Sequence, residues 1–321
     1  MTYFDHDCRD IVLYARKPKE LIPHPYYLAN IPVQDQAQGT KLEPYWIARF
    51  SAGDGGFSIS LYQSSRARLG YEITFKFVVS QRSIDNLVIN KLLDYFKGLG
   101  FSQDRDRDNC STFVVSSTVT LWNIIVPFFL SYPLNTVKQF DLYLFYQVLS
   151  LMPLNSAEKV EQIKLILTCM NKHKHHLTNM PALHPWWVTG FINAEGCFLI
   201  SFYKKKNYRL GIKVVPRLLI TQHGENALVF EALKEFFGCG RIYKGDTGFE
   251  IEGFKSITEV VIPHFLAYPL QSIKRDDFSH FVRIVDIIRE KKHLTKEGLE
   301  SIRKIKSIMN RGRPIDTVKD N

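Results

Sequence analysis

An internal repeat constrains this chain of 321 residues more than any other feature. Residues 45–57, YWIARFSAGDGGF, return as residues 186–198, WWVTGFINAEGCF, so that Asp54 and Glu195 lie 141 positions apart. Val79-Ser80-Gln81 returns as Ile220-Thr221-Gln222 at the same spacing, and a longer segment around Tyr-Pro-Leu also occurs twice. Self-similarity at a long, fixed spacing marks duplicated structural units. The chain is therefore expected to be two copies of one domain fused in tandem.

The spacing of apolar residues predicts the same order of elements in both copies. A helix is followed by a hairpin, a second helix, two further strands and a helix that ends at Tyr-Pro-Leu. The predicted helices are 45–54, 85–97, 186–195 and 225–237, and the strand-like segments are 57–62, 71–79, 101–116, 198–203, 210–221 and 240–253. The predicted fold class is α+β, with two αββαββα repeats and one final helix after each. A glycine follows each first helix, where a positive φ would end it.

The repeat also sets the expected domain boundaries. Residues 44–171 form the first repeat and residues 186–313 the second. The polar segment 172–185, which contains two prolines and several histidines, is expected to be a solvated linker, because its spacing fits no standard metal site. Residues 1–43 match neither copy and are expected to form an N-terminal extension, and residues 314–321 a C-terminal tail.

Charge points to a polyanionic partner. The formal net charge is +10, and residues 172–321 carry 25 basic and 16 acidic side chains, so the second copy is the basic one. The five cysteines include no CxxC pair, which argues against a zinc module. No apolar run approaches the roughly 20 residues of a membrane span, and the N-terminus lacks the pattern of a signal peptide. We therefore expect a soluble protein that works inside the cell or inside an organelle.

The acid at the end of each repeated helix is the clearest chemical signal. Small residues at Gly190 and Ala194 would let a second helix approach closely, and two such helices crossing would bring Asp54 and Glu195 together. Paired carboxylates repel each other unless a cation lies between them. Their oxygen ligands favour magnesium, which can activate water for phosphodiester hydrolysis. The alternative is two acidic helix ends exposed to solvent, which the duplication makes less favoured.

The hairpins supply a surface for phosphate. Residues 197–224 contain no acidic residue and six basic ones: Lys204, Lys205, Lys206, Arg209, Lys213 and Arg217. The matching residues 56–83 contain four basic residues, Arg66, Arg68, Lys76 and Arg82, against the single acid Glu72. A two-stranded ribbon fits the major groove of DNA. The alternative is that lysines in a turn only interact with water.

Both repeated helices resemble the motif of the LAGLIDADG homing endonucleases, WVTGFINAEGCF closely and WIARFSAGDGGF more loosely. The stretches ITQHGENALVFEALKEFFGCG and EKKHLTKEGLESIRKIKSIMNRGR are similar to the monomeric branch found in fungal mitochondrial group I introns. The resemblance covers about residues 44–313. It implies a mitochondrial, monomeric, intron-encoded endonuclease that cuts a long double-stranded DNA target with Mg²⁺, with the repeated helices at the interface and the sheets forming a saddle. Mn²⁺ or Ca²⁺ would also occupy the site, Ca²⁺ without cleavage.

The resemblance also assigns roles by position. It implies metal binding by Asp54 and Glu195 and by the carbonyls of Gly53 and Ala194. It implies that Gln81 and Gln222 organise water, and that Lys138 and Lys274 stabilise charge on the phosphate. The expected DNA contacts are Ser60, Tyr62, Arg66, Arg68, Glu72, Thr74, Lys76 and Arg82 in the first copy. In the second copy they are Ser201, Tyr203, Lys206, Arg209, Lys213, Val215, Arg217, Arg241 and Tyr243.

One position departs from the family pattern. Arg49 stands where the family usually has glycine, as Gly190 does in the second copy. A long cation there predicts a rotated helix, a wider crossing, or a side chain that snorkels past the contact. Both catalytic acids are intact, so cleavage is expected. The alternatives are an RNA-binding maturase that helps its intron to fold, and a DNA-binding remnant that has lost cleavage.

Overall fold

The computed structural model describes residues 42–105, 109–153, 156–170, 180–221, 227–243 and 248–310. Four expected features lie wholly or largely outside these residues: the N-terminal extension, the linker with its histidines, Gln222 and the C-terminal tail. The chain divides into two compact units, Met1–Met180 and Pro181–Asn321, with a boundary inside the segment 172–185.

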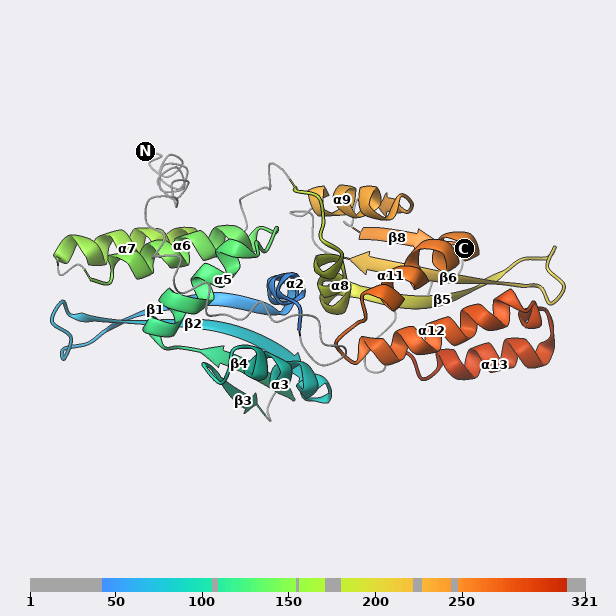
Figure 1. The fold of residues 1–321 in the computed structure, drawn as a ribbon, viewed down its shortest axis with the longest axis horizontal. Helices are drawn as coiled ribbons and strands as arrows, with labels where there is room; N and C mark the ends of the chain where they lie inside the picture. Colours follow the sequence, from blue (N-terminus) through green and yellow to red (C-terminus); the bar gives the residue numbers. More distant parts are fainter. Residues whose placement is uncertain are drawn as a thin grey trace. The chain divides into compact units, whose positions relative to one another are not determined.

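The first unit carries a four-stranded antiparallel sheet in the order β1-β2-β4-β3 (Figure 1). Helix α2 leads directly into β1, and helices α6 and α3 contact β1 and β2 respectively. The elements are α2 (Pro44–Asp54), β1 (Gly55–Gln63), β2 (Tyr71–Arg82), α3 (Asn86–Tyr95), β3 (Phe101–Arg105), β4 (Cys110–Val115), α4 (Thr118–Thr120), a π-helical turn (Leu121–Ile125), α5 (Val126–Ser131), α6 (Lys138–Leu151) and α7 (Ala157–Cys169). Short 3-10 turns occur at Ser83–Asp85 and, in the second unit, at Lys292–Leu294.

The second unit repeats this order, with the sheet β5-β6-β8-β7. Its elements are α8 (Pro185–Glu195), β5 (Gly196–Lys204), β6 (Ile212–Thr221), α9 (Ala227–Phe237), β7 (Arg241–Tyr243), β8 (Gly248–Glu252), α10 (Phe254–Ser256), a π-helical turn (Ile257–Val261), α11 (Ile262–Ala267), α12 (Lys274–Arg289) and α13 (Lys296–Lys306). The predicted α+β fold of two αββαββα repeats is confirmed.

Each repeat ends in two helices, not in the one that was expected. In the first unit α6 ends before Pro153, and the hydroxyl of Ser156 accepts from the backbone N–H of Lys159 to start α7. In the second unit Lys291 takes a left-handed φ of 57°, and Thr295 accepts from the N–H of Gly298 to start α13. Helix caps of this kind satisfy backbone donors that would otherwise lack partners. A proline in one copy and a left-handed residue in the other thus divide the end of each repeat.

The expected positive φ after each first helix is wrong. Gly55 has φ −115° and Gly196 has φ −82°, which are extended conformations open to any residue. Glycine is required there for space. A Cβ on Gly55 would lie 2.6 Å from the carbonyl oxygen of Ser51, and one on Gly196 would lie 2.6 Å from Cγ2 of Ile192. The strand therefore leaves the helix so abruptly that no side chain fits between them.

Helices cover one face of each sheet and aromatic side chains fill the space between them. In the first unit Phe57 contacts the rings of Phe77, Phe129 and Phe145 at 5.2–5.5 Å between centroids. In the second unit Phe198 contacts Phe265, Phe278 and Phe281 in the same way. Because successive strand residues point to opposite faces, each sheet keeps a second face, which we call its open face. No helix in the described part of the chain is long and apolar enough to cross a membrane.

Candidate active site and nucleic-acid interface

Asp54 and Glu195 occupy matching places in the two units. Each is the last residue of its helix, α2 or α8, and each is half-buried. The following residue starts a strand, with Gly55 paired to Val79 and Gly196 paired to Ile220. Both carboxylates are therefore held at the point where a helix passes directly into a paired strand.

A lysine from a distant helix lies beside each of these acids. Lys138, the first residue of α6, donates from Nζ to the carbonyl oxygens of Gly53 (2.9 Å) and Gly55 (2.7 Å). Lys274, the first residue of α12, is buried and donates to those of Ile192 (3.1 Å) and Ala194 (3.0 Å). The structure thus brings each predicted lysine to the helix end that carries its predicted acid.

The donor groups at these helix ends fit a hard divalent cation. Each end offers one carboxylate and one backbone carbonyl, and oxygen ligands of this type are those that Mg²⁺ prefers. A carbonyl oxygen has two lone pairs, so the lysine bond to Gly53 or Ala194 leaves one for a second partner. Among the described residues no three His, Cys, Asp or Glu side chains gather as a metal cluster. A cation at either helix end would have that one carboxylate and that one carbonyl as protein ligands, with water or phosphate as its other partners.

Two further predicted features have definite places in the first unit. Arg49 on α2 is fully buried, which does not favour the alternative that its side chain snorkels past the helix contact; the rotated helix and the wider crossing stay predictions. Gln81 lies near the end of β2, paired with Ser111 of β4, and is partly exposed.

The open face of the first sheet gathers most of the first set of predicted DNA contacts. Register pairs Ser60 with Thr74, and Tyr62 with Glu72. Thr74, Lys76 and Tyr62 are exposed, and Ser60 is partly exposed. Lys76 and the hydroxyls of Ser60 and Thr74 lower the pKa of Tyr62, with the hydrogen bond to Ser60 the largest cause. Glu72 accepts a hydrogen bond from Ser64 at 2.6 Å.

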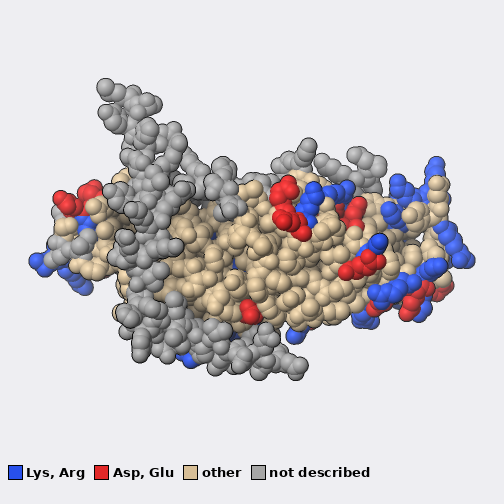
Figure 2. All heavy atoms as spheres, turned by 45° about the horizontal axis from the view of Figure 1, so that its top comes forward, with Lys and Arg blue, Asp and Glu red and all other residues tan. Residues whose placement is uncertain are grey.

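The hairpin turns and the end of β2 carry further basic residues of both sets. Arg66 and Arg68 lie in the β1–β2 turn, Arg82 ends β2, and Lys206 and Arg209 lie in the β5–β6 turn, all exposed. The two turns close alike, since Ser64 N–H donates to the carbonyl of Gly70 (2.9 Å) and Lys205 N–H to that of Gly211 (2.8 Å). Figure 2 shows Lys and Arg gathered at the end of the second unit, where the β5–β6 turn and the α12–α13 connection lie.

The open face of the second sheet is partly covered by its own side chains. Tyr203 and Lys213 are paired across β5 and β6 and reach the surface, whereas Ser201 and Val215 are buried. Ser201 accepts a hydrogen bond from Arg217, whose guanidinium also contacts Glu250. Direct contact with DNA through Ser201 and Val215 therefore stays a prediction that their burial does not favour.

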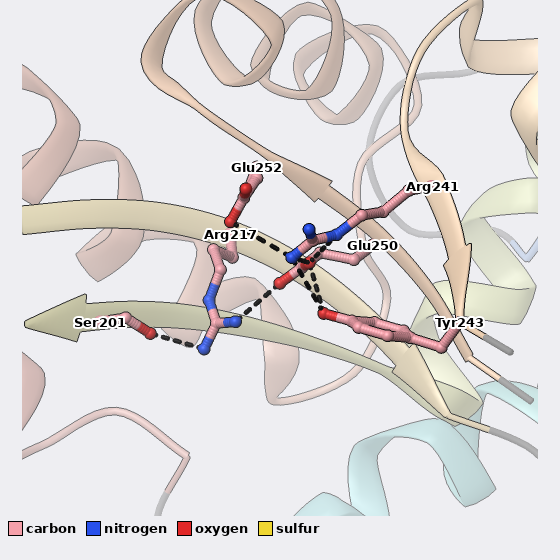
Figure 3. Close-up of polar contacts among 6 residues, drawn as sticks. All are labelled: Ser201, Arg217, Arg241, Tyr243, Glu250 and Glu252. Atoms are coloured by element: carbon pink, nitrogen blue, oxygen red, sulfur yellow. Dashed lines mark hydrogen bonds and ion pairs between the residues drawn. The ribbon is translucent and has the colours of Figure 1, made fainter. Parts of the chain in front are cut away.

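Glu250 is a residue that the sequence reasoning missed. It lies on β8 and forms hydrogen bonds with three predicted DNA contacts, Arg217, Arg241 and Tyr243 (Figure 3). Its position between Phe249 and Ile251, both fully buried on the core face, is the only signal in the sequence. Strand alternation places a residue flanked in this way on the open face.

Comparison with known proteins agrees with this geometry. Residues 47–149 and 188–285 match the LAGLIDADG endonuclease family. The "Probable intron-encoded endonuclease 2" of Neurospora crassa is 28% identical over 312 residues, which cover 87% of this chain and 67% of that protein. The "Uncharacterized 50.9 kDa protein in ND4 intron 1" of Podospora anserina is 34% identical over 143 residues, which cover 43% of this chain and 31% of that protein.

A solved structure of I-SmaMI bound to uncleaved DNA target in the presence of calcium ions is 27% identical, with a TM-score of 0.77 over 85% of this chain and 100% of that one. The chain spans about two thirds of the length of the first of these curated relatives and about a third of the second. Two family matches, one on each repeat, together cover well over half of its residues. The chain belongs to the LAGLIDADG endonuclease family.

Proposed function

We propose that this protein is a homing endonuclease that makes a Mg²⁺-dependent double-strand break in a long DNA target that is only partly symmetric. The observation that carries the proposal is the duplicated helix end, with Asp54 beside Lys138 in one unit and Glu195 beside Lys274 in the other. Two acids and two lysines provide one acid and one lysine for each of two phosphodiester bonds, one on each DNA strand. Membership of a family of DNA endonucleases supports the same reaction.

The residues of each helix end would share the chemistry. Asp54, Glu195 and the carbonyls of Gly53 and Ala194 would hold the metal, with Mn²⁺ as a substitute and Ca²⁺ occupying the site without cleavage. Bound Mg²⁺ would supply Lewis acidity and a more acidic water. Lys138 and Lys274 would stabilise negative charge on the phosphate, and Gln81 and Gln222 would orient water.

The two open faces and their hairpin turns would hold the DNA. Two-stranded ribbons fit the major groove, where base edges can be read, and basic turns contact phosphates without regard to sequence. We propose that one chain suffices, because it contains both acids and both sheets. The homology to intron-encoded fungal proteins supports a mitochondrial location.

Cleavage of the intronless host-gene junction tests the proposal. The purified full chain is incubated with Mg²⁺ and a plasmid that carries this junction, and the expected product is one defined double-strand break. Asp54→Asn and Glu195→Gln should abolish the break and keep the gel shift, whereas Glu259→Gln, which changes an exposed acid on another surface, should cut normally.

Two other outcomes would identify the alternatives. A protein that binds the junction and never cuts it would be the cleavage-inactive remnant. A protein that stimulates splicing of its intron, in a separate splicing assay, without making a break would be the maturase. Lys292 and Arg303, two basic residues that RNA could contact, already have partners within the protein: Lys292 pairs with Glu290 at 2.5 Å, and the guanidinium of Arg303 lies over the ring of Phe202 at 5.9 Å.

A further inference from the structure

Glu250 is a buried carboxylate on the open face of the second sheet. Its side chain has an exposed fraction of 0%, yet its neighbours Phe249 and Ile251 point into the core and it points to the open face. The side chains that lie over it cause its burial. They come from the two strands that flank β8, the strand of Glu250: Arg217 lies on β6, and Arg241 and Tyr243 lie on β7.

Both carboxylate oxygens of Glu250 have charged partners. Oε1 accepts from Nη1 of Arg217 at 2.7 Å, and Oε2 accepts from Nε (2.8 Å) and Nη2 (2.6 Å) of Arg241 and from the hydroxyl of Tyr243. Burial raises the pKa of Glu250, but the bonds from Tyr243 and Arg241 and the charge of Arg217 outweigh it, so the pKa lies below its usual value. The carboxylate is therefore ionised at neutral pH and holds both guanidiniums in place.

The two arginines differ in how many of their guanidinium N–H donors remain available to a ligand. Arg217 has a side chain only 15% exposed, and its Nη2 donates to Ser201 at 2.6 Å, so its guanidinium is committed to the cluster. Arg241 has a side chain 57% exposed and contacts Glu250 through Nε and Nη2. A guanidinium has five N–H donors in one plane, so the Nη1 side of Arg241 remains directed away from Glu250 (Figure 3).

An arginine held in one plane suits recognition of guanine. Two parallel donors of arginine match O6 and N7 of guanine in the major groove, and this geometry discriminates against the other bases. A free arginine must lose conformational freedom on binding, whereas one fixed beforehand loses less. Tyr243 restricts Arg241 further, since its ring lies 5.3 Å from the guanidinium carbon.

We infer that Glu250 is a positioning residue that orients Arg241 to read a guanine in the part of the DNA target that faces the second repeat. The inference rests on the proposed function, because it names how that function selects its site. Glu250 itself need not touch DNA.

The first repeat has different chemistry at the matching positions. Val78 pairs with Val114 as Leu219 pairs with Glu250, and Phe101 pairs with Val114 as Arg241 pairs with Glu250. The acid and arginine are thus replaced by Val114, which is buried, and Phe101, which is 50% exposed. The guanine preference is therefore expected in only one half of the target, which gives the experiment an internal reference.

Selection from a duplex library with randomised base pairs tests this inference. The full chain is incubated with the library and Ca²⁺, bound duplexes are recovered by gel shift, and base preferences are read by sequencing. Wild type should show a guanine preference of roughly tenfold at one position in the second-repeat half, in the range of a bidentate contact. Arg241→Lys should abolish it, and Glu250→Gln should weaken it at least about threefold at that position alone.

Two further variants separate positioning from charge and from folding. Glu252→Gln removes the same charge from the same strand at a side chain 40% exposed and 3.7 Å from Arg241, so its profile should match wild type. Tyr243→Phe keeps every charge and deletes one hydroxyl bonded to Glu250, so it should also weaken the guanine preference. If Glu250→Gln no longer unfolds cooperatively, Tyr243→Phe is the variant that tests whether Arg241 is positioned.

Several outcomes would overturn the inference. The inference fails if Glu250→Gln keeps the full guanine preference, or, where that variant does not fold, if Tyr243→Phe keeps it. It also fails if Glu250→Gln loses base preference equally at every position, which would indicate general destabilisation. An equal effect of Glu252→Gln would indicate that only the charge matters. A wild type that selects no sequence would instead overturn the proposed function, so the two failures are distinguishable.

Discussion

The Nζ of Lys274 lies 3.0 Å from the carbonyl oxygen of Ala194, the residue before Glu195, and Lys138 repeats this contact with Gly53 before Asp54. The last carbonyls of a helix have no partner within the helix and carry partial negative charge. A lysine there stabilises the helix end before any substrate binds. Each lysine therefore has a structural role in addition to its proposed role at the phosphate.

Lys274→Met should lower stability as well as cleavage. Nζ of Lys274 is bonded to two carbonyls in a buried place, and hydrogen bonds to charged groups contribute about 1.5–3 kcal/mol each. We expect a lower urea midpoint and the loss of cleavage. Lys255→Met, at a side chain 84% exposed, is the control and should change neither. Full stability of Lys274→Met with lost cleavage would contradict the structural role.

Gly196→Ala should destabilise the protein although its φ is ordinary. The new Cβ would lie 2.6 Å from Cγ2 and 2.9 Å from the carbonyl oxygen of Ile192, and overpacking of this kind costs about 1–3 kcal/mol. Gly56→Ala is the matched control in the first repeat, because a Cβ there meets nothing within 4 Å. Urea denaturation should separate the two variants by their midpoints. Equal midpoints would mean that the helix–strand junction shifts to accommodate the added Cβ at little cost in free energy.

The stability of the second unit should depend on His264. Its Nε2 lies 3.1 Å from Oγ1 of Thr189, which donates to the carbonyl of Tyr268, so a neutral His264 donates to Thr189. Aromatic rings surround the imidazole, among them Phe237 and Phe265, and burial lowers its pKa to about 4. The unfolded chain binds the proton near pH 6.5 and the folded chain only near pH 4. Stability is therefore full above about pH 6.5 and falls as the pH drops towards 4.

Phe128 occupies the matching position in the first repeat, which makes His264→Phe the natural test. This variant should lose the part of the pH dependence that His264 causes, on the order of 3 kcal/mol between pH 7 and pH 4. Urea midpoints at several pH values measure it. If wild type and variant lose stability in parallel over this range, His264 is not the group that titrates.

The repeat made most of the architecture predictable, and side-chain chemistry far apart in the sequence did not follow from it. Helix α8 was expected at 186–195 and spans Pro185–Glu195, because proline and glycine bound it on both sides. Lys274 lies at the helix end that carries Glu195, and its role at the phosphate stays a prediction. Glu250 was missed because its partners Arg217 and Arg241 approach it only through strand register, which local periodicity does not reveal. Burial of Arg49 depends likewise on packing that the motif does not encode.

Removing one charge from the β5–β6 turn should make DNA binding less sensitive to salt. Lys205 is exposed, follows Lys204 at the end of β5 and precedes Lys206. The lysines of this turn can therefore neutralise DNA phosphates and release the counterions bound to them. Lys205→Gln should weaken binding to any duplex about equally and reduce the slope of log affinity against log salt by about one. Fluorescence anisotropy with a random-sequence duplex at several KCl concentrations measures the slope.

Lys255→Gln should leave the slope unchanged, since its exposed side chain lies on α10, away from the turn. An unaltered slope in Lys205→Gln would mean that the turn interacts only with water, and that the second sheet binds DNA through its open face alone.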